Sequence, residues 1–320
     1  MSRDGVASMS LQARLRLPLI AAPMFLVSGP ELVTAACRAG IIGAFPTANC
    51  RTREELDAWL HRIRDALKAH EDATGRAAPP FCPNLIVHRS NPRVPTDLAV
   101  LLAHRPELVI TSVGTPAPVL APLHDAGVRV LADVAPIEHA EKAAAAGVDG
   151  LILLTAGAGG QTGWLNPFAF VRAVRRFFDG IVVLAGGISD GRALRAAEVL
   201  GADLAYMGTK FIATRESLAP DAYREMVVRA TADDIVLTKA ITGLETNILA
   251  ESLVGAGIDP AASRGALDVA RDITAGAPQR WKHIWSAGHS VSGVTEILDV
   301  AELVARTEAE YHGSHRPTFP

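Results

Sequence analysis

The stretch from Leu151 to Phe211 constrains the fold more than any other part of the chain. Two amphipathic segments, Pro167 to Phe178 and Asp190 to Leu200, separate three short apolar runs. The runs are Leu151 to Thr155, Ile181 to Ala185 and Leu204 to Met207. They are too short for helices and lack alternation, which is typical of strands buried on both faces. A crossover helix between successive strands predicts that the strands pair in parallel.

Glycines follow each of these predicted strands. They are Gly157, Gly159 and Gly160 after the first strand, Gly186 and Gly187 after the second, and Gly208 after the third. Glycine-rich loops let backbone N–H groups approach an anion closely, and Ser189 or Asp190 can cap the helix after the second loop. The loops after the last two strands of (β/α)8 barrels commonly form a phosphate site. The sequence therefore predicts a phosphate site, although tight turns alone would explain a single Gly-Gly pair.

The chain before Leu151 continues the alternation of strands and helices. Five further apolar runs predict strands at Pro18–Met24, Ile41–Pro46, Phe81–Val87, Leu108–Val113 and Val128–Val134. Thr52 and Glu55 form a capping box at the start of a helix that is expected to run through Leu67. Eight strands spaced about 20 to 30 residues apart predict an α/β fold, a closed (β/α)8 TIM barrel. An open doubly wound sheet is the alternative, but it would more often need fewer strands.

The regular alternation of predicted strands and helices ends after Phe211. We predict that residues 15–213 and 286–312 form the barrel, and that 214–285 form a mostly helical insertion that covers the substrate. Within the insertion, Leu244 to Ile258 looks helical. Residues 313–320 are expected to form a mobile tail.

Composition narrows the possible functions. Of the 320 residues, 49% are apolar and 20% are charged, which supports a sizeable core. A net charge of −3 gives no argument for binding nucleic acid or an anionic membrane. No apolar run approaches a membrane span and the first residues lack a signal peptide, so we expect a cytoplasmic protein. The cysteines lack metal-binding spacing, and His312 and His315 lack a third ligand, so no metal site is expected.

Seven segments stand in a characteristic order along the chain. They are RLPLIAAPMFLVSGPELVTAACRAG, PNLIVHRSNPR, AEKAAAAGVDGLILL, GAGG-x-x-G, AGGISDGRAL, GADLAYMGTKF and RWKHIWSAG. Together they resemble the nitronate monooxygenase family, formerly called 2-nitropropane dioxygenases, which borders the flavin-dependent enoyl reductases. The resemblance extends from about Leu15 to Tyr311 and implies a barrel that binds FMN non-covalently at the carboxyl ends of its strands.

The resemblance also implies which residues contact the flavin. The backbone of Ala22, Pro23 and Met24 would lie beside the isoalloxazine, and Asn84 would bond to its pyrimidine edge. The other implied contacts are made by glycine loops and the end of the last strand. Near the flavin these are Gly159 and Gly160, and around the phosphate they are Gly186, Gly187, Met207, Gly208 and Thr209. The phosphate site implied by the family coincides with the one predicted from the glycine loops.

One departure from the family changes the expected chemistry. Family members usually carry a histidine in a GG-H-x-G loop, as a base or an orienting group, whereas this chain has Gln161 in GGQTG. An amide cannot accept a proton near neutral pH, but it can donate two hydrogen bonds to a nitro or carbonyl oxygen. Gln161 therefore cannot deprotonate a neutral nitroalkane, although a substrate that is already anionic could still be oxidised.

Two other residues are candidates for the acid or base that Gln161 cannot provide. The late family loop SAGQG reads Ser286-Ala-Gly-His289-Ser290 here, as if histidine and glutamine had exchanged loops. Our hypothesis is that loop 286–293 folds over the flavin and that His289 restores an acid or base. The alternative is an exposed loop histidine. Asp133, at the end of the fifth strand, is a second candidate base, or else a capping carboxylate.

These observations favour an FMN-dependent oxidoreductase that oxidises a small activated anion, such as an alkyl nitronate, with O2. An NAD(P)H-dependent flavin reductase of a quinone or an enoyl thioester is a second hypothesis. A redox-free phosphate-binding isomerase or lyase is a third, and a flavin-binding protein that has lost the family's activity is a fourth. In each case the expected partner is a small molecule, and the sequence does not predict an oligomeric state.

Overall fold

Eight parallel strands close into a barrel, which confirms the predicted (β/α)8 fold. The computed structural model describes residues 11–263, 265, 267–270 and 283–313, so the expected tail lies outside the described residues apart from Gly313. The strands are β1 (Leu19–Ala21), β2 (Ile42–Pro46), β3 (Phe81–Ile86), β4 (Leu108–Ser112), β5 (Arg129–Val134), β6 (Gly150–Leu154), β8 (Ile181–Ala185) and β9 (Leu204–Met207). Each of them coincides with a predicted strand.

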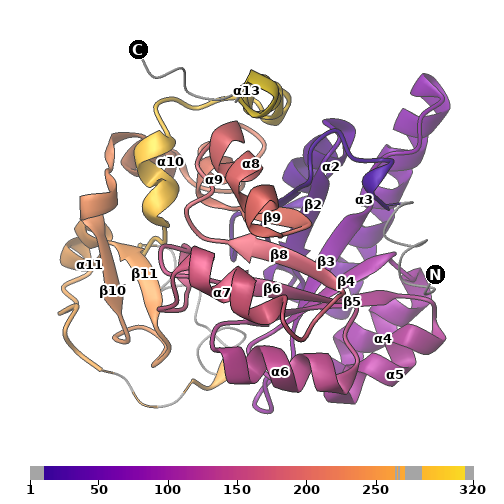
Figure 1. Cartoon of the computed structure of the whole chain (residues 1–320), viewed down its shortest axis with the longest axis horizontal. Coiled ribbons are helices and arrows are strands. Elements are labelled where there is room, and N and C mark those ends of the chain that lie inside the picture. Colours follow the sequence, from indigo (N-terminus) through magenta and orange to yellow (C-terminus); the bar gives the residue numbers. More distant parts are fainter. Residues whose placement is uncertain (1–10, 264, 266, 271–282, 314–320) are drawn as a thin grey trace.

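Helices alternate with the strands and surround the barrel (Figure 1). They are α2 (Pro30–Arg38), α3 (Arg53–Thr74), α4 (Val94–His104), α5 (Ala117–Asp125), α6 (Ile137–Ala146), α7 (Pro167–Val174), α8 (Gly191–Leu200) and α13 (Val300–Gly313). As predicted, Thr52 caps α3, and its Oγ1 accepts the backbone N–H of Glu55 at 3.1 Å. The helix continues past its predicted end at Leu67, because the C-cap comes only at Gly75, where φ is +68°.

The barrel strands bury both of their faces, which explains their continuous apolar runs. Neighbouring residues of one strand belong to different clusters: Ile20 and Ile110 pack inside the barrel, whereas Leu19 and Val109 pack beneath the helices. All four side chains are fully buried. Among the described residues, no helix combines the length and apolar character that crossing a bilayer requires.

The segment after β9 forms a separate layer beside the barrel, shown in orange in Figure 1. It contains α9 (Thr209–Ile212), α10 (Asp221–Arg229), β10 (Ile235–Thr238), β11 (Thr246–Leu249) and α11 (Ala250–Gly255). The prediction of one helix from Leu244 to Ile258 is wrong, because its first part is β11. This strand pairs antiparallel with β10 and with β7 (Gly160–Gln161), a short strand in the loop after β6. Long-range pairing overrides the local helical pattern here.

Helix α13 completes the outer layer by packing against α8 at Gly191. A Cβ atom on this buried glycine would lie 2.1 Å from the Thr307 carbonyl oxygen and 2.2 Å from the Tyr311 backbone nitrogen. The Gly191 N–H also donates to Glu310 Oε2 at 3.0 Å. A side chain at this position would therefore force the two helices apart.

We predict that Gly191→Ala lowers the free energy of unfolding by about 1–3 kcal/mol through this steric conflict. The matched control is Gly255→Ala at the end of α11, because a Cβ there would meet no atom within 4 Å. The control should stay within about 0.5 kcal/mol of wild type in urea denaturation. Equal stability of the two variants would contradict the close approach of α13 to α8.

Candidate active site

A cavity of about 470 Å³ opens at the carboxyl ends of the barrel strands. Strand ends and following loops form its floor, including Asn84 of β3 and Asp133 of β5. The segment after β9 forms its other wall, with Leu244, Thr246 and Trp285 among the lining residues. The volume is typical of a small-molecule site, and the position is the one at which barrel enzymes carry their chemistry.

All of the predicted flavin-contacting residues except Met207 line this cavity. They are Ala22, Pro23, Met24, Asn84, Gly159, Gly160, Gly186, Gly187, Gly208 and Thr209. Met207 is buried in β9, and its carbonyl accepts the N–H of Ala22 at 2.9 Å, beyond the last pair of residues in the β1–β9 ladder. The fold thus brings together residues that lie up to 187 positions apart, while their individual contacts to a flavin stay predictions.

A residue that the sequence analysis did not single out, Asn49, holds the loop after β1. Its Oδ1 accepts the N–H of Leu26 at 2.8 Å, and its Nδ2 donates to the carbonyls of Met24 and Ser28 at 3.1 and 2.8 Å. Leu26 has a φ of +59°, a strained conformation for a residue with a Cβ atom. Buried Asn49 therefore fixes a strained loop at the edge of the cavity. No motif marks it, because its partners lie in another βα loop.

The loop after β8 exposes bare backbone to the cavity. Gly186 and Gly187 have φ values of +112° and +75°, which glycine adopts at little cost. A Cβ on Gly186 would lie 2.5 Å from Thr155 Oγ1, which itself donates to the Ala185 carbonyl at 2.6 Å. Nearby, Thr209 Oγ1 accepts the N–H of Gly288 at 2.9 Å. A tightly packed glycine loop beside a hydroxyl suits an anionic group such as the phosphate of a flavin nucleotide.

Gln161 lies in β7 and lines the cavity, half-buried. Its backbone pairs with Thr246 of β11, and the next N–H, that of Thr162, donates to the Glu245 carbonyl at 3.1 Å. Asn247 adds a bond from its Nδ2 to the Ala158 carbonyl at 2.7 Å. Within the described residues, the Gln161 side chain makes no hydrogen bond. Its amide is therefore free to bond to a molecule in the cavity.

Asp133 lines the same cavity from the end of β5. Among the described residues, its Oδ1 is buried without a hydrogen-bond partner. Burial raises the pKa of this carboxyl from 3.8 to about 8. Asp133 is therefore mostly protonated at neutral pH and then offers a hydrogen-bond donor, while its role as a base through the ionised fraction stays a prediction. Tyr206, whose pKa is raised by burial and secondarily by the Asp133 charge, also has a buried hydroxyl without a partner in the described chain.

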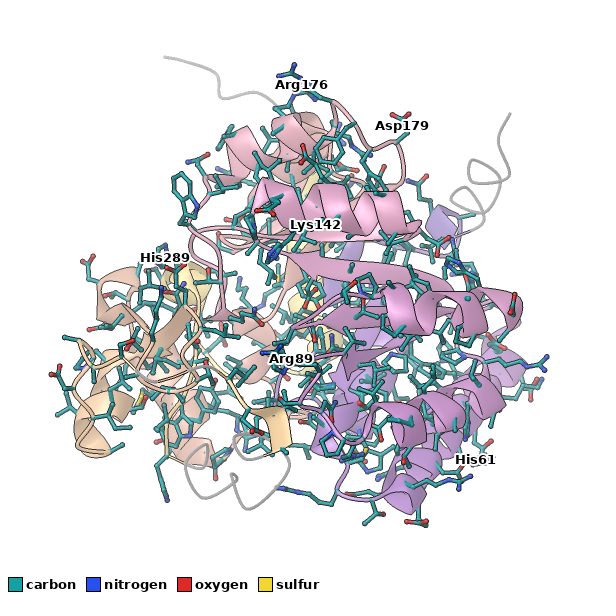
Figure 2. All side chains as sticks on the ribbon, turned by 90° about the horizontal axis from the view of Figure 1, so that it is seen from below. His61, Arg89, Lys142, Arg176, Asp179 and His289 are labelled. Atoms are coloured by element: carbon teal, nitrogen blue, oxygen red, sulfur yellow. The ribbon has the colours of Figure 1, made fainter. Side chains whose placement is uncertain are left out.

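His289 is placed outside this cavity, on the exposed surface of the molecule (Figure 2). It lines a second cavity of about 520 Å³ together with Lys210 and Ser189. Its backbone N–H donates to the Gly157 carbonyl at 2.9 Å, and its ring packs beside that glycine. Its neighbours Ala287 and Ser290 line the first cavity whereas His289 lines the second, so the role of His289 as an acid or base stays a prediction.

The lining of the first cavity contains no histidine, lysine, arginine or glutamate among the described residues. Asp133 is its only carboxyl group, and the other titratable side chains of the described lining are Tyr206 and Tyr223, both with raised pKa values because of burial. Asp133 is thus the one carboxyl in the described lining that can accept a proton, and its raised pKa leaves only a minor fraction of it ionised at neutral pH.

Comparison with known proteins places this architecture in a family. The family model described as nitronate monooxygenase matches residues 8–309. The chain belongs to the nitronate monooxygenase family. As a member of that family it is a flavin-dependent oxidoreductase.

Three relatives illustrate the range of the similarity. A nitronate monooxygenase of Paraburkholderia phytofirmans is 29% identical and covers 92% of both chains. The structure of a nitroalkane oxidase from Streptomyces ansochromogenes has a TM-score of 0.79 and 26% identity, and covers 96% of this chain and 100% of its own. The structure of FabK from Thermotoga maritima has a TM-score of 0.77 and 25% identity, and the match covers 98% of this chain and 97% of the FabK chain. The fold is therefore shared by enzymes with differently named activities.

The raised pKa of Asp133 makes stability depend on pH. Because the folded pKa of about 8 lies above the unfolded value of 3.8, the native state holds this proton more tightly, and stability is lost as pH rises from about 4 to 8. We predict that Asp133→Asn, which is neutral at every pH, removes this loss. The stability gain of the variant over wild type should grow by on the order of 2–4 kcal/mol between pH 5 and pH 8.

The measurement is urea unfolding of wild type and Asp133→Asn at both pH values and at equal flavin content. All other titrating groups are common to the two proteins, so their contributions cancel. A constant difference between the two unfolding free energies would mean that Asp133 ionises normally in the folded protein.

Proposed function

We propose that the protein binds FMN and oxidises a small, already anionic substrate such as an alkyl nitronate, with O2 as the electron acceptor. The observation that carries this proposal is the lack of a histidine in the described lining: Gln161 is an amide, and Asp133, the one carboxyl there, is mostly protonated at neutral pH. A substrate that must lose a proton before oxidation needs a base, whereas a preformed nitronate does not.

The residues present fit a flavin mononucleotide. Gly186, Gly187, Gly208 and Thr209 would hold its phosphate through backbone N–H groups and a hydroxyl. Asn84 would meet the pyrimidine edge, and its Oδ1 already accepts a bond from Ser112 at 3.2 Å, which fixes the orientation of the amide. Bound FMN would supply the electron transfer.

Neutral donors would hold the substrate. The Gln161 amide can donate to a nitronate oxygen, and the protonated Asp133 carboxyl offers a second donor in the same cavity. The apolar side chains of Leu244, Ile284 and Trp285 line the wall of the cavity that the segment after β9 forms. They would exclude water from the hydrogen bonds between these donors and the substrate. Trp285 stacks on Tyr223 with ring centroids 5.1 Å apart, which keeps this wall rigid. The combination suits a short alkyl chain with one small anionic head.

The test is the reduction of the protein-bound flavin under anaerobic conditions by ethylnitronate, nitroethane and NADPH, each added alone. We expect ethylnitronate to bleach the visible flavin bands and neutral nitroethane to bleach them far more slowly at neutral pH, because Gln161 cannot ionise it and Asp133 is mostly protonated. Bleaching by nitroethane at a comparable rate would contradict the proposed preference for a preformed anion and would make Asp133 the first base to test. A colourless protein, as purified and after addition of FMN, would refute FMN binding itself.

Returning a base to position 161 should extend the substrate range. We predict that Gln161→His oxidises nitroethane about 10²-fold faster than wild type or more, because general-base catalysis contributes that much. Its rate with ethylnitronate should change far less. His289→Ala is the matched control and should leave both rates close to wild type, since His289 lies outside the cavity. Loss of nitronate oxidation in His289→Ala would show that this loop reaches the substrate after all.

A second function is favoured by the full-length similarity to FabK. An enoyl reductase of this type would take electrons from NAD(P)H, so NADPH alone would bleach the flavin while ethylnitronate would not. The described cavity lining supplies no lysine or arginine for the phosphates of a nicotinamide or coenzyme A carrier. Reduction by ethylnitronate or by NADPH therefore distinguishes the two functions in one experiment.

A further inference from the structure

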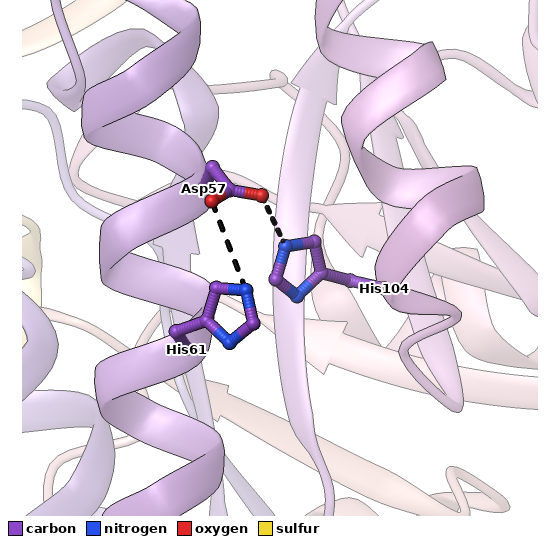
Figure 3. Close-up of side chains that lie close together, drawn as sticks. All are labelled: Asp57, His61 and His104. Carbon is purple, nitrogen blue, oxygen red and sulfur yellow. Dashed lines mark hydrogen bonds and ion pairs between the residues drawn. The ribbon is translucent and has the colours of Figure 1, made fainter.

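Two histidines and an aspartate converge on the outside of the barrel, far from the cavity described above. Asp57 and His61 lie one helical turn apart on α3, and His104 is the last residue of α4 (Figure 3). Their potential ligand atoms all lie within 4.8 Å of one another. Figure 2 shows His61 on the opposite side of the molecule from His289. The active site does not involve this cluster.

The distances show how the three side chains are arranged. His104 Nε2 lies 2.7 Å from Asp57 Oδ1, and His61 Nε2 lies 3.7 Å from Asp57 Oδ2. The two imidazole rings are 4.6 Å apart at an angle of 73°. Both histidines thus direct a ring nitrogen toward the same carboxylate, from two different helices. A hydrogen bond between His104 and Asp57 would tie the helices together without His61, so it does not explain why the second imidazole is there.

We propose that Asp57, His61 and His104 bind a divalent transition-metal ion of the zinc class between α3 and α4. Two imidazoles and one carboxylate form a common three-residue ligand set for zinc, with the fourth position left to water. The same nitrogen ligands disfavour Mg²⁺ and Ca²⁺, which prefer oxygen. The ion would replace the proton that His104 and Asp57 now share.

The site needs only a small adjustment to close on an ion. Ligand atoms on one tetrahedral zinc ion lie roughly 3.3 Å apart, given bonds of about 2.0–2.1 Å. The side chain of His104 is only 3% exposed and therefore stays in place, whereas those of Asp57 and His61 are 50% and 58% exposed and can move. Their i, i+4 spacing keeps both on one face of α3. One rigid ligand and two adaptable ones at the surface give an ion a route in from solvent.

The surroundings of the cluster fix the end of α4. Arg64 donates to the His104 carbonyl, and the next residue, Arg105, has a φ of +47°. Arg53 and Glu54 lie close enough to Asp57 to act on it with opposite signs. A metal ion here would clamp the turn that leads from α4 into β4.

The test uses purified, untagged, chelator-treated full-length protein that keeps its flavin. Zn²⁺ titrated by calorimetry should bind at one site per chain, and Co²⁺ should give the visible absorption of a tetrahedral complex, recorded as a difference spectrum so that the flavin bands cancel. Zn²⁺ should also raise the Tm, because it binds the folded state. Excess Mg²⁺ should not compete.

The informative variant is His61→Ala, because its exposed side chain can be removed without disturbing the core. We expect it to weaken Zn²⁺ binding by about tenfold or more and to abolish both the Co²⁺ spectrum and the Tm increase. His139→Ala on α6 is the control, since that exposed histidine belongs to no such cluster among the described residues. Failure of wild type to bind Zn²⁺, or an unchanged Co²⁺ spectrum in His61→Ala, would overturn the proposal and leave the Asp57–His104 hydrogen bond as a purely structural link.

Discussion

Closure of the barrel between its first and last strands is the constraint on which the site depends. The strands β1 and β9 pair in parallel with Ala21 opposite Met207, and the Ala22 N–H bonds to the Met207 carbonyl just beyond them. Because all eight strands run in the same direction, closure gathers every carboxyl end at one rim. Loops that are distant in sequence then share one cavity. Without this pairing, the glycine loop after β8 and the loop after β1 would not face each other.

The apolar character of that cavity explains why Asp133, the one carboxyl in its described lining, is mostly protonated at neutral pH. A site lined mainly by apolar groups and backbone disfavours any buried charge, and the same effect that keeps Asp133 protonated would act on another ionisable group placed there. The neutral amide of Gln161 is therefore consistent with its surroundings. An anion in such a cavity is held by oriented neutral donors, which need no reorganisation when a substrate binds.

The parts of the structure that the sequence predicts are those with local signals. Each barrel strand is a short apolar run in the sequence. The loops at the carboxyl ends of the strands are rich in glycine, because positive φ values and close backbone approach exclude a Cβ atom there. The features that escaped prediction depend on distant partners. Leu244 to Ile258 has a helical pattern, but its first residues form a strand because they pair with β10 and β7. Asn49 and the direction of the His289 loop likewise follow from tertiary contacts that no local pattern encodes.

The pairing of β7 with β11 has a consequence for how this family can vary its chemistry. Position 161 is held by backbone pairing with a strand of the later segment, and within the described part of the chain its side chain makes no hydrogen bond to the loop. Backbone pairing is indifferent to the identity of the side chain, so histidine and glutamine can occupy this position on the same scaffold. The loop geometry and the proton-transfer chemistry are therefore separate properties. A substitution at position 161 can change which protonation state of a substrate is accepted while the cavity that binds the flavin stays intact.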